Sequence, residues 1–179
     1  MGSWSSIARR IRVPLGFAFA VLYLWLAEPT VKSILGGAVL IVPGLVIRAL
    51  ASGHLQKNQQ LATGGPYAYT RNPLYLGSLI LSVGFALAAR NWWIVAGIVL
   101  LFFVIYLPVI RAEEVFLRER FPQFDEYARE VPGLFPRASR FDKRSGSFSW
   151  ELYRKHREYN ASLGSAAIMA ALLGKLLWG

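Results

Sequence analysis

The polar segment 64–77 carries residues that could bind both an anion and a cation. It reads GGPYAYTRNPLYLG. Pro73 can open a helix at its first position, and free backbone N–H groups at a helix start attract anionic groups. Arg71 lies beside that start, and its guanidinium can match a carboxylate bidentately. Tyrosine rings can also face a cation, and the segment supplies Tyr67, Tyr69 and Tyr75. The alternative is a row of tyrosines at lipid-headgroup depth, with Arg71 marking the cytoplasmic side.

Two adjacent carboxylates, Glu113 and Glu114, follow closely after a long apolar run. Carboxylates so near to hydrocarbon are costly unless they have partners. Neighbouring residues on a helix point about 100° apart, so one glutamate can face inward while the other faces water or an arginine. An inward carboxylate could bind vicinal hydroxyls or an ammonium group. The alternative is charge balance in a basic region, with Arg111 and Arg118 as the partners.

Hydrolytic and metal-dependent chemistry find little support in the sequence. The chain has no cysteine and only two histidines, His54 and His156, so we expect no metal centre built from thiolates or several histidines. No Ser-His-Asp arrangement, P-loop or HExxH motif is present. His54, beside Gly53, has two interpretations: a hydrogen-bonding group at a helix end, or a group that takes a proton in a reaction.

Apolar segments on both sides of these residues predict a membrane protein. The chain has 179 residues, of which 55% are apolar. Five long apolar blocks can be drawn, at 13–27, 31–51, 74–89, 92–110 and 161–178. A full span needs about 20 residues, which the second and fourth blocks meet, whereas the others would borrow flanking residues. A cleavable signal peptide is the alternative for the first block, but no small-residue cleavage site follows it. We therefore predict an all-α integral membrane bundle of about five transmembrane helices, built from one domain over residues 1–179.

The loops between the blocks predict the topology of this bundle. Arg90-Asn91 alone joins the third and fourth blocks, which requires an antiparallel helical hairpin. If the N-terminus is cytoplasmic, all of the 20 Lys and Arg residues except Lys32, Arg90 and Lys175 fall on the cytoplasmic side. The positive-inside rule therefore predicts that orientation, in the inner membrane if the source is bacterial. The loop 52–73 and the region 111–160 then share the cytoplasmic side and can build one site.

The net charge of +10 is expected to serve contact with membrane lipids. The basic residues flank apolar blocks, where they can contact anionic headgroups. Nucleic acid is not an expected partner, because no basic face interleaved with stacking aromatics lies outside the membrane flanks. Residues 148–160 mix aromatic and basic side chains, which predicts an interfacial helix leading into the last span at 161–178.

Two blocks of sequence resemble a known family. Residues 53–77, GHLQKNQQLATGGPYAYTRNPLYLG, are similar to the signature of isoprenylcysteine carboxyl methyltransferases and related phospholipid methyltransferases, which ends in Gly-x-Tyr and then Arg-His-Pro-x-Tyr-x-Gly. Residues 113–137, EEVFLRERFPQFDEYAREVPGLFPR, resemble the family's second block: a Glu pair, an apolar helix, Phe-Gly, a Tyr, Val-Pro and a final Pro. The resemblance implies an integral membrane enzyme that uses S-adenosylmethionine without a Rossmann fold and releases S-adenosylhomocysteine.

The resemblance also implies roles for individual residues. The segments 52–77 and 111–137 would cap a cofactor pocket on the cytoplasmic side. Glu113 would contact the cofactor's ribose or amino group, and Arg111 would steer an anionic substrate. His54 or a glutamate such as Glu114 would take a proton from an amine or phenol acceptor. The other implied cofactor contacts are Gln59, Gln60, Leu61 and Ala62 at the adenosine end, Tyr67, Asn72, Pro73, Leu74 and Tyr75 around the methionine portion, and additionally Lys57 and Arg71.

Two residues depart from the family pattern. Asn72 stands where the family usually has His. If that His orients the cofactor through one ring nitrogen, an Asn amide can imitate it, but if the His takes a proton, Asn cannot. Pro122 replaces the usual Gly after Phe121, which is expected to alter the turn after the glutamate helix.

Taken together, the sequence predicts S-adenosylmethionine-dependent methyl transfer to a lipophilic acceptor, a carboxylate or an amine, at the cytoplasmic membrane interface. A water-borne donor and an apolar acceptor can meet only there, with the acceptor entering sideways between helices. One alternative is a membrane sterol-type reductase that uses NADPH, whose C-terminal region is also similar. The other is a non-enzymatic membrane scaffold. Isoprenylcysteine, a phospholipid amine and a small hydrophobic metabolite all stay open as acceptors.

Overall fold

The computed structural model describes residues 3–56, 59–139, 141 and 147–178, and within them every regular element is a helix. This confirms the all-α prediction. The lysine predicted to contact the cofactor, Lys57, lies outside the described residues. The elements are α1 (Ser3–Leu26), α2 (Val31–His54), the 3-10 turn η1 (Gly65–Ala68), α3 (Pro73–Ala89), α4 (Trp92–Leu101), the π-helical turn η2 (Phe102–Tyr106), α5 (Leu107–Arg120), α6 (Phe124–Glu130), α7 (Trp150–Lys155) and α8 (Tyr159–Trp178).

Among the described residues, three helices are long and apolar enough to cross a membrane. They are Val31–His54, Tyr159–Trp178 and the continuous rod Trp92–Arg120, in which α4, η2 and α5 follow one another without a break. Two further apolar helices, Pro14–Leu26 and Pro73–Ala89, are shorter than a full span. The membrane-helix character of the fold is thus confirmed, while the number five stays a prediction.

The helices α2 and α3 pack against each other through glycines. A Cβ placed on Gly37 would lie 2.5 Å from the backbone oxygen of Gly84, and one on Gly44 would lie 3.0 Å from that of Gly77. Backbones approach this closely only where side chains are absent, a common solution for helices inside lipid. The pair α2–α3 therefore forms a rigid centre on which the other helices are arranged.

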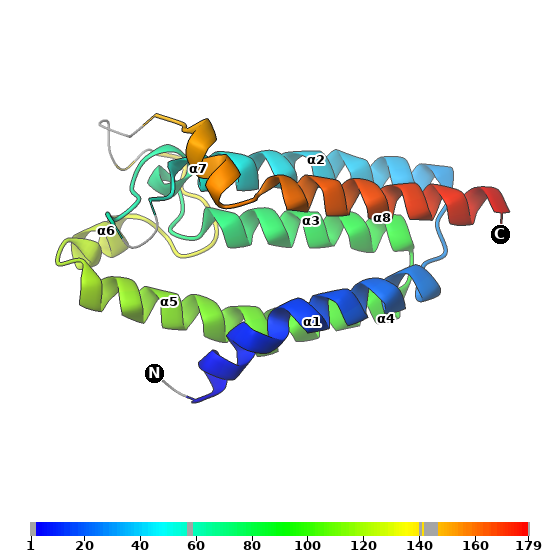
Figure 1. The fold of residues 1–179 in the computed structure, drawn as a ribbon, viewed down its shortest axis with the longest axis horizontal. Coiled ribbons are helices and arrows are strands. Elements are labelled where there is room, and N and C mark those ends of the chain that lie inside the picture. Colours follow the sequence, from blue (N-terminus) through cyan, green and yellow to red (C-terminus); the bar gives the residue numbers. More distant parts are fainter. Residues whose placement is uncertain (1–2, 57–58, 140, 142–146, 179) are drawn as a thin grey trace.

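The predicted hairpin between the third and fourth apolar blocks is present. Arg90 takes the left-handed conformation with φ 54° and ends α3, and the Asn91 side chain caps α4 by accepting a hydrogen bond from Trp93 N at 2.9 Å. Figure 1 shows α3 and α4 meeting at this turn, and α5 running on from α4 away from α3. At the turn end, side chains of α1, α2, α3, α4 and α8 form one apolar core that includes Tyr23, Ile34, Ala88, Ile94 and Leu172.

The region predicted as one interfacial helix over 148–160 is two elements instead. α7 ends at Lys155, and α8 already begins at Tyr159. Between them Arg157 has φ 53°, a left-handed conformation that a continuous helix cannot contain. The N-terminus of α7 is tied to the end of α2, since Ser149 N donates to Gly53 O at 2.9 Å. The C-terminal segment therefore returns to the loop end of α2 before α8 runs back along it (Figure 1).

Candidate active site

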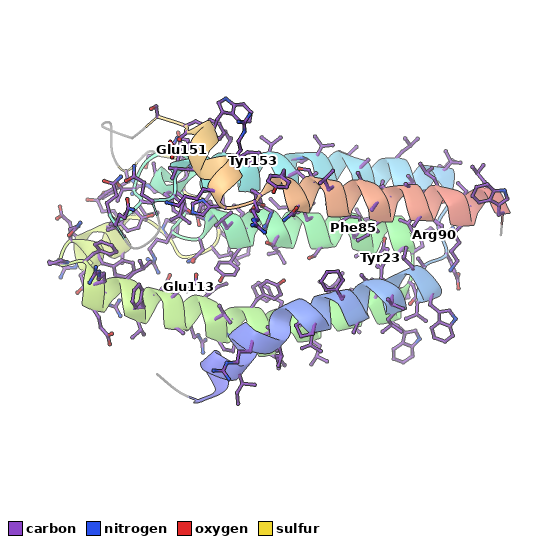
Figure 2. All side chains as sticks on the ribbon, in the orientation of Figure 1. Tyr23, Phe85, Arg90, Glu113, Glu151 and Tyr153 are labelled. Atoms are coloured by element: carbon purple, nitrogen blue, oxygen red, sulfur yellow. The ribbon has the colours of Figure 1, made fainter. Side chains whose placement is uncertain are left out.

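A pocket of about 740 Å³ opens where α2, α3 and α5 meet the loops, at the end of the bundle away from the Arg90 turn. Its walls come from segments far apart in the sequence. These are the end of α2, the loop after it, the first turns of α3, Tyr106 in η2, residues 112–117 of α5, and α6. Both Tyr75 on α3 and Glu113 on α5, the latter labelled in Figure 2, line it. Most of the predicted site residues line this pocket, namely Gln60, Leu61, Ala62, Tyr67, Arg71, Asn72, Pro73, Leu74, Tyr75, Glu113 and Glu114.

The loop before α3 is fastened to the segment after α5 by hydrogen bonds between residues 67–72 and 127–137, which we call the loop junction. Thr70 Oγ1 donates to the carbonyls of Gly133 and Leu134, at 3.1 and 2.9 Å. Arg71 N donates to Pro132 O, and Arg137 N donates to Tyr69 O, both at 2.9 Å. Buried polar backbone is stable only when paired in this way. The two blocks singled out by the family resemblance are therefore in direct contact.

Arg71 is the central cation of the loop junction. Its Nε donates to Glu114 Oε1 at 3.0 Å, and its Nη2 lies 3.0 Å from the same oxygen. Its Nη1 donates to the carbonyls of Ala128 and Val131, at 2.9 and 2.8 Å. Each of its three side-chain nitrogens thus has a partner within the protein. The guanidinium thus joins α5 to the end of α6, and the role of Arg71 as a cofactor contact stays a prediction.

Asn72 belongs to the same network. Its Nδ2 donates to Glu114 Oε1 at 3.1 Å and to Gly133 O at 2.9 Å. The amide thus acts as a donor, and both N–H groups have acceptors. This bears on the departure from the family's His: here the side chain holds neighbours in place and is not set up to take a proton. Pro73 opens α3 at the first helical position, as predicted.

The two adjacent glutamates have different surroundings. Glu114 accepts from Arg71 and Asn72 and is half-buried, with 23% of its side chain exposed. Glu113 lines the same pocket and makes no hydrogen bond or ion pair within the part of the chain that the structure describes. The predicted charge-balance partners are wrong: Glu114 pairs with Arg71, and Arg118 pairs with Asp125 at 2.8 Å. As the 100° rotation between neighbouring helix residues predicts, the two glutamates face different surroundings. Glu113 is the available carboxylate of the two.

Two buried tyrosines seal the inner side of the loop junction. Tyr127 OH on α6 donates to Tyr67 O in η1 at 2.7 Å. Burial raises the pKa of the Tyr67 hydroxyl well above its ordinary value, and the neighbouring Tyr127 and Glu113 act in the same direction. Burial also raises the pKa of Tyr127, while Arg71 opposes and Glu114 supports that shift. Both phenols are therefore neutral donors at physiological pH and not bases.

Three predicted site residues that the structure describes do not line the pocket. His54 ends α2, and its Nδ1 lies 2.7 Å from Leu50 O, with its ring beside Gly65 and Phe148. These contacts agree with the interpretation of His54 as a hydrogen-bonding group at a helix end, and they place its ring outside the pocket lining. Arg111 is exposed on α5, and Gln59 is exposed in a turn, both outside the lining. Lys57, as stated above, lies outside the described residues.

Several lining residues are not expected from the sequence, and Arg48 and Ser78 are the most polar of them. Arg48 lies inside α2 and Ser78 inside α3, in runs that otherwise look like membrane helix. The charge of Arg48 within an apolar block was the available signal, but it was used only for orientation. Tyr106, in the π-helical turn η2, was missed as well; its ring meets that of Tyr75 edge to face, with centroids 6.1 Å apart.

Within the described ranges no group of three or more His, Cys, Asp or Glu side chains could hold a metal ion. The pocket offers one carboxylate, Glu113, without a partner among the described residues, together with aromatic walls, a helix start and the Arg48 guanidinium, and the loop junction borders it. Such a set can bind and orient a charged, partly apolar molecule and keep water away from it.

This arrangement agrees with what comparison with known proteins shows. Residues 39–123 match the family model described as "Phospholipid methyltransferase", which confirms the resemblance predicted from the two sequence blocks. The matched part runs from α2 through α5 and contains most of the pocket lining.

Two curated proteins give similar stretches. The chain is 38% identical over 98 residues to the cobalt-zinc-cadmium resistance protein CzcN of Cupriavidus metallidurans, covering 55% of this chain and 44% of that protein. It is 39% identical over 90 residues to the nickel-cobalt-cadmium resistance protein NccN of Alcaligenes xylosoxydans xylosoxydans, covering 50% of this chain and 42% of that protein. The alignments thus span less than half the length of these relatives. No solved structure matches the chain.

Proposed function

We propose that this protein is an S-adenosylmethionine-dependent methyltransferase that acts on a lipophilic acceptor at the cytoplasmic face of a membrane. The observation that carries the proposal is the shared pocket: Tyr75 and Glu113, which belong to different sequence blocks, line one space of about 740 Å³. The family match over residues 39–123 supports the choice of reaction. The cytoplasmic side is proposed from the distribution of Lys and Arg.

The residues present fit S-adenosylmethionine. A pocket of about 300–1,000 Å³ is typical for a molecule of that size. The cofactor carries a sulfonium and an ammonium. The pocket offers Glu113, which has no partner among the residues that the structure describes, and the edge-to-face rings of Tyr75 and Tyr106. Carboxylates and aromatic faces both attract cations. The adenosine end would meet Gln60, Leu61 and Ala62, which line the same space.

Each wall of the pocket has a separate task in this proposal. When bound, the cofactor supplies a methyl group activated by its sulfonium. Glu113 binds the ribose or the amino group, and Tyr67 with the stretch Asn72–Tyr75 surrounds the methionine portion. The loop junction excludes water and fixes the start of α3, and such positioning can account for much of a rate enhancement. A carboxylate acceptor needs no base, which suits this site, because Glu113 is engaged by the cofactor and Glu114 is held by Arg71 and Asn72.

Binding of the product S-adenosylhomocysteine to the purified protein in detergent micelles tests the proposal. Calorimetry should detect binding of S-adenosylhomocysteine and none of NADPH. Glu113→Gln should weaken the affinity for S-adenosylhomocysteine tenfold or more, which corresponds to about 1.4 kcal/mol. Glu119→Gln is the matched control, because Glu119 is exposed on the same helix and outside the pocket lining. Binding of NADPH alone would favour the reductase, and binding of neither would favour a scaffold.

Transfer itself is measured by mass spectrometry of membrane lipid extracts incubated with the protein and isotopically methyl-labelled S-adenosylmethionine. The expected result is a labelled lipid that is absent with Glu113→Gln and present with Glu119→Gln. Cofactor binding with no labelled lipid or small hydrophobic product would contradict the proposed reaction.

A further inference from the structure

Arg48 lines the proposed site, yet neither the resemblance nor the loop junction gives it a task. It lies on α2, a candidate membrane span, with 23% of its side chain exposed. Its position is six residues before His54, which ends the helix, so it lies about 9 Å further along the helix axis from the loops. An arginine at that depth is costly unless it is partnered, and such residues in membrane helices usually serve a function.

The contacts of Arg48 fix one part of its guanidinium and leave another available. Its Nε donates to Glu158 Oε1 at 2.6 Å. Its Nη1 donates to the Ser78 hydroxyl and lies 3.5 Å from Leu74 O. A guanidinium has five N–H donors, and the two on Nη2 have no acceptor within the described part of the chain. Since no buried side-chain nitrogen or oxygen described there lacks a partner, Nη2 is not buried, and the space that Arg48 lines is the pocket.

The other charges of the pocket leave an anion as the complement of Arg48. The second lining cation, Arg71, is engaged through all its nitrogens by Glu114 and two carbonyls. The free carboxylate, Glu113, suits the cationic cofactor. The Ser78 hydroxyl accepts from Arg48 Nη1 and donates to Leu74 O at 2.9 Å, so on the helical side of the pocket the spare donors among the described residues are those of Arg48 Nη2. Anionic oxygens are the ligands that such donors bind most strongly.

We propose that Arg48 is a specificity-determining residue that binds the anionic group of the methyl acceptor, a phosphate or a carboxylate on a lipid chain. This deepens the proposed methyltransferase function and rests on it. Arg48 and Ser78 lie one to two turns inside α2 and α3, between the loops and the hydrocarbon, which is the depth of a lipid headgroup. Glu158, in the turn between α7 and α8, is a positioning residue that orients the guanidinium.

Native mass spectrometry of the full chain in detergent micelles tests this with matched lipid pairs. Phosphatidic acid and diacylglycerol with the same acyl chains differ only in the phosphate, and palmitic acid and hexadecanol differ in the carboxylate. Wild-type protein should retain at least one of the anionic lipids tenfold or more over its neutral partner, and the pair that shows the preference identifies the anion. The preference should fall to about one in Arg48→Gln and stay unchanged in Arg129→Gln, a control that removes an exposed arginine on α6.

Loss of Arg48 leaves Glu158 unpaired, so two further variants guard against misfolding. Arg48→Gln combined with Glu158→Gln removes both charges and should lose the preference while melting near the wild-type temperature. Arg48→Lys keeps the positive charge but loses the guanidinium's bidentate hydrogen bonding, so it should retain part of the preference for the anionic lipid. An undiminished preference in the folded double variant, or no preference in the wild type, would overturn the inference.

Calorimetry with S-adenosylhomocysteine separates this inference from the proposed function. The Arg48 variants should bind S-adenosylhomocysteine within threefold of the wild-type affinity. A larger loss, with lipid preference intact, would assign Arg48 to the cofactor and overturn the inference while leaving the methyltransferase proposal in place. Failure of the wild type to bind S-adenosylhomocysteine would remove the proposed function, whereas the lipid pairs would still report on Arg48.

Discussion

The two ends of this helical bundle are closed by different means. At the Arg90 turn, side chains of five helices meet in a dry apolar core around Tyr23, Ile94 and Leu172. At the opposite end α5 lies apart from α3 (Figure 1). There the hydrogen-bonded loop junction connects the start of α3 to the segment that follows α5. At the turn end a hollow of about 730 Å³ between α3 and α4 is lined mostly by apolar side chains, whereas the loop junction borders a pocket of about 740 Å³ that also has charged side chains in its lining.

The contrast teaches where a small membrane protein can keep a site for a water-soluble molecule. Irregular backbone cannot face lipid, because its polar groups would go unpaired. It can lie at the water end of a bundle when another segment satisfies it, as the carbonyls of Gly133 and Leu134 satisfy Thr70.

The largest expected effect concerns the glycine contact between α2 and α3. Gly37→Leu should destabilise the protein by about 3 kcal/mol, at the upper end of the usual range for overpacking, because its Cβ would lie 2.5 Å from Gly84 O. Gly36→Leu is the control, since a Cβ on Gly36 meets nothing within 4 Å. Thermal unfolding in detergent compares the two, and equal melting temperatures would show that the closed end does not depend on this approach.

The next effect separates the two glutamates. Glu114→Gln should cost about 2 kcal/mol of stability, because Arg71 would lose the charge of its partner while staying half-buried. Glu113→Gln should change stability by less than about 0.5 kcal/mol, since Glu113 makes no ion pair in the described part of the chain. Thermal unfolding of both variants measures the difference. A reversed order would mean that Glu113, and not Glu114, holds the loop junction together.

A smaller effect is expected for the phenol that bridges α6 and η1. Tyr127→Phe removes the 2.7 Å hydrogen bond to Tyr67 O and should cost about 1 kcal/mol at neutral pH. Because the ring itself is kept, the apolar packing around Phe124 and Val131 should not change. Affinity for S-adenosylhomocysteine, measured by calorimetry, should fall together with stability if the junction shapes the pocket. A variant as stable as the wild type would argue against this bond.

The smallest effect is a pH dependence of stability. Burial raises the pKa of Tyr127 in the folded state above its ordinary value near 10. Above that pH the unfolded chain loses a proton that the folded chain keeps, so stability is constant below pH 10 and falls above it. Tyr127→Phe removes this contribution and should lessen the loss by about 0.8 kcal/mol at pH 10.5. Parallel curves for wild type and variant would show that the hydroxyl is not protected by burial.

The fold and part of the site could be predicted from sequence because local rules decide them. Arg90-Asn91 leaves no alternative to a hairpin, and Pro73 can only begin a helix there. The rotation of about 100° between neighbours predicts that Glu113 and Glu114 face different surroundings. The prediction of one interfacial helix over 148–160 is wrong, since nothing in the sequence marks Arg157 as the residue that separates α7 from α8.

The remainder of the site depends on contacts between distant residues that no local pattern encodes. Arg71 was assigned to an anion because its partners lie 43 or more residues further along the chain. Arg48 was used only as a marker of membrane orientation, because a single arginine in an apolar block looks like a flank. Its pairing with Glu158, 110 residues away, is visible only in three dimensions.

The loop junction also has a consequence for biosynthesis. Its hydrogen-bonded partners are separated by 57 to 68 residues, and a ribosome needs about 3 to 14 seconds to add that many. During this interval the helices that follow Asn72 are already leaving the ribosome, while the Thr70 hydroxyl still lacks the carbonyls of Gly133 and Leu134. A nascent chain arrested before Gly133 would therefore carry a half-built ligand chamber, and translation would have to continue past that residue before any nucleoside could be held.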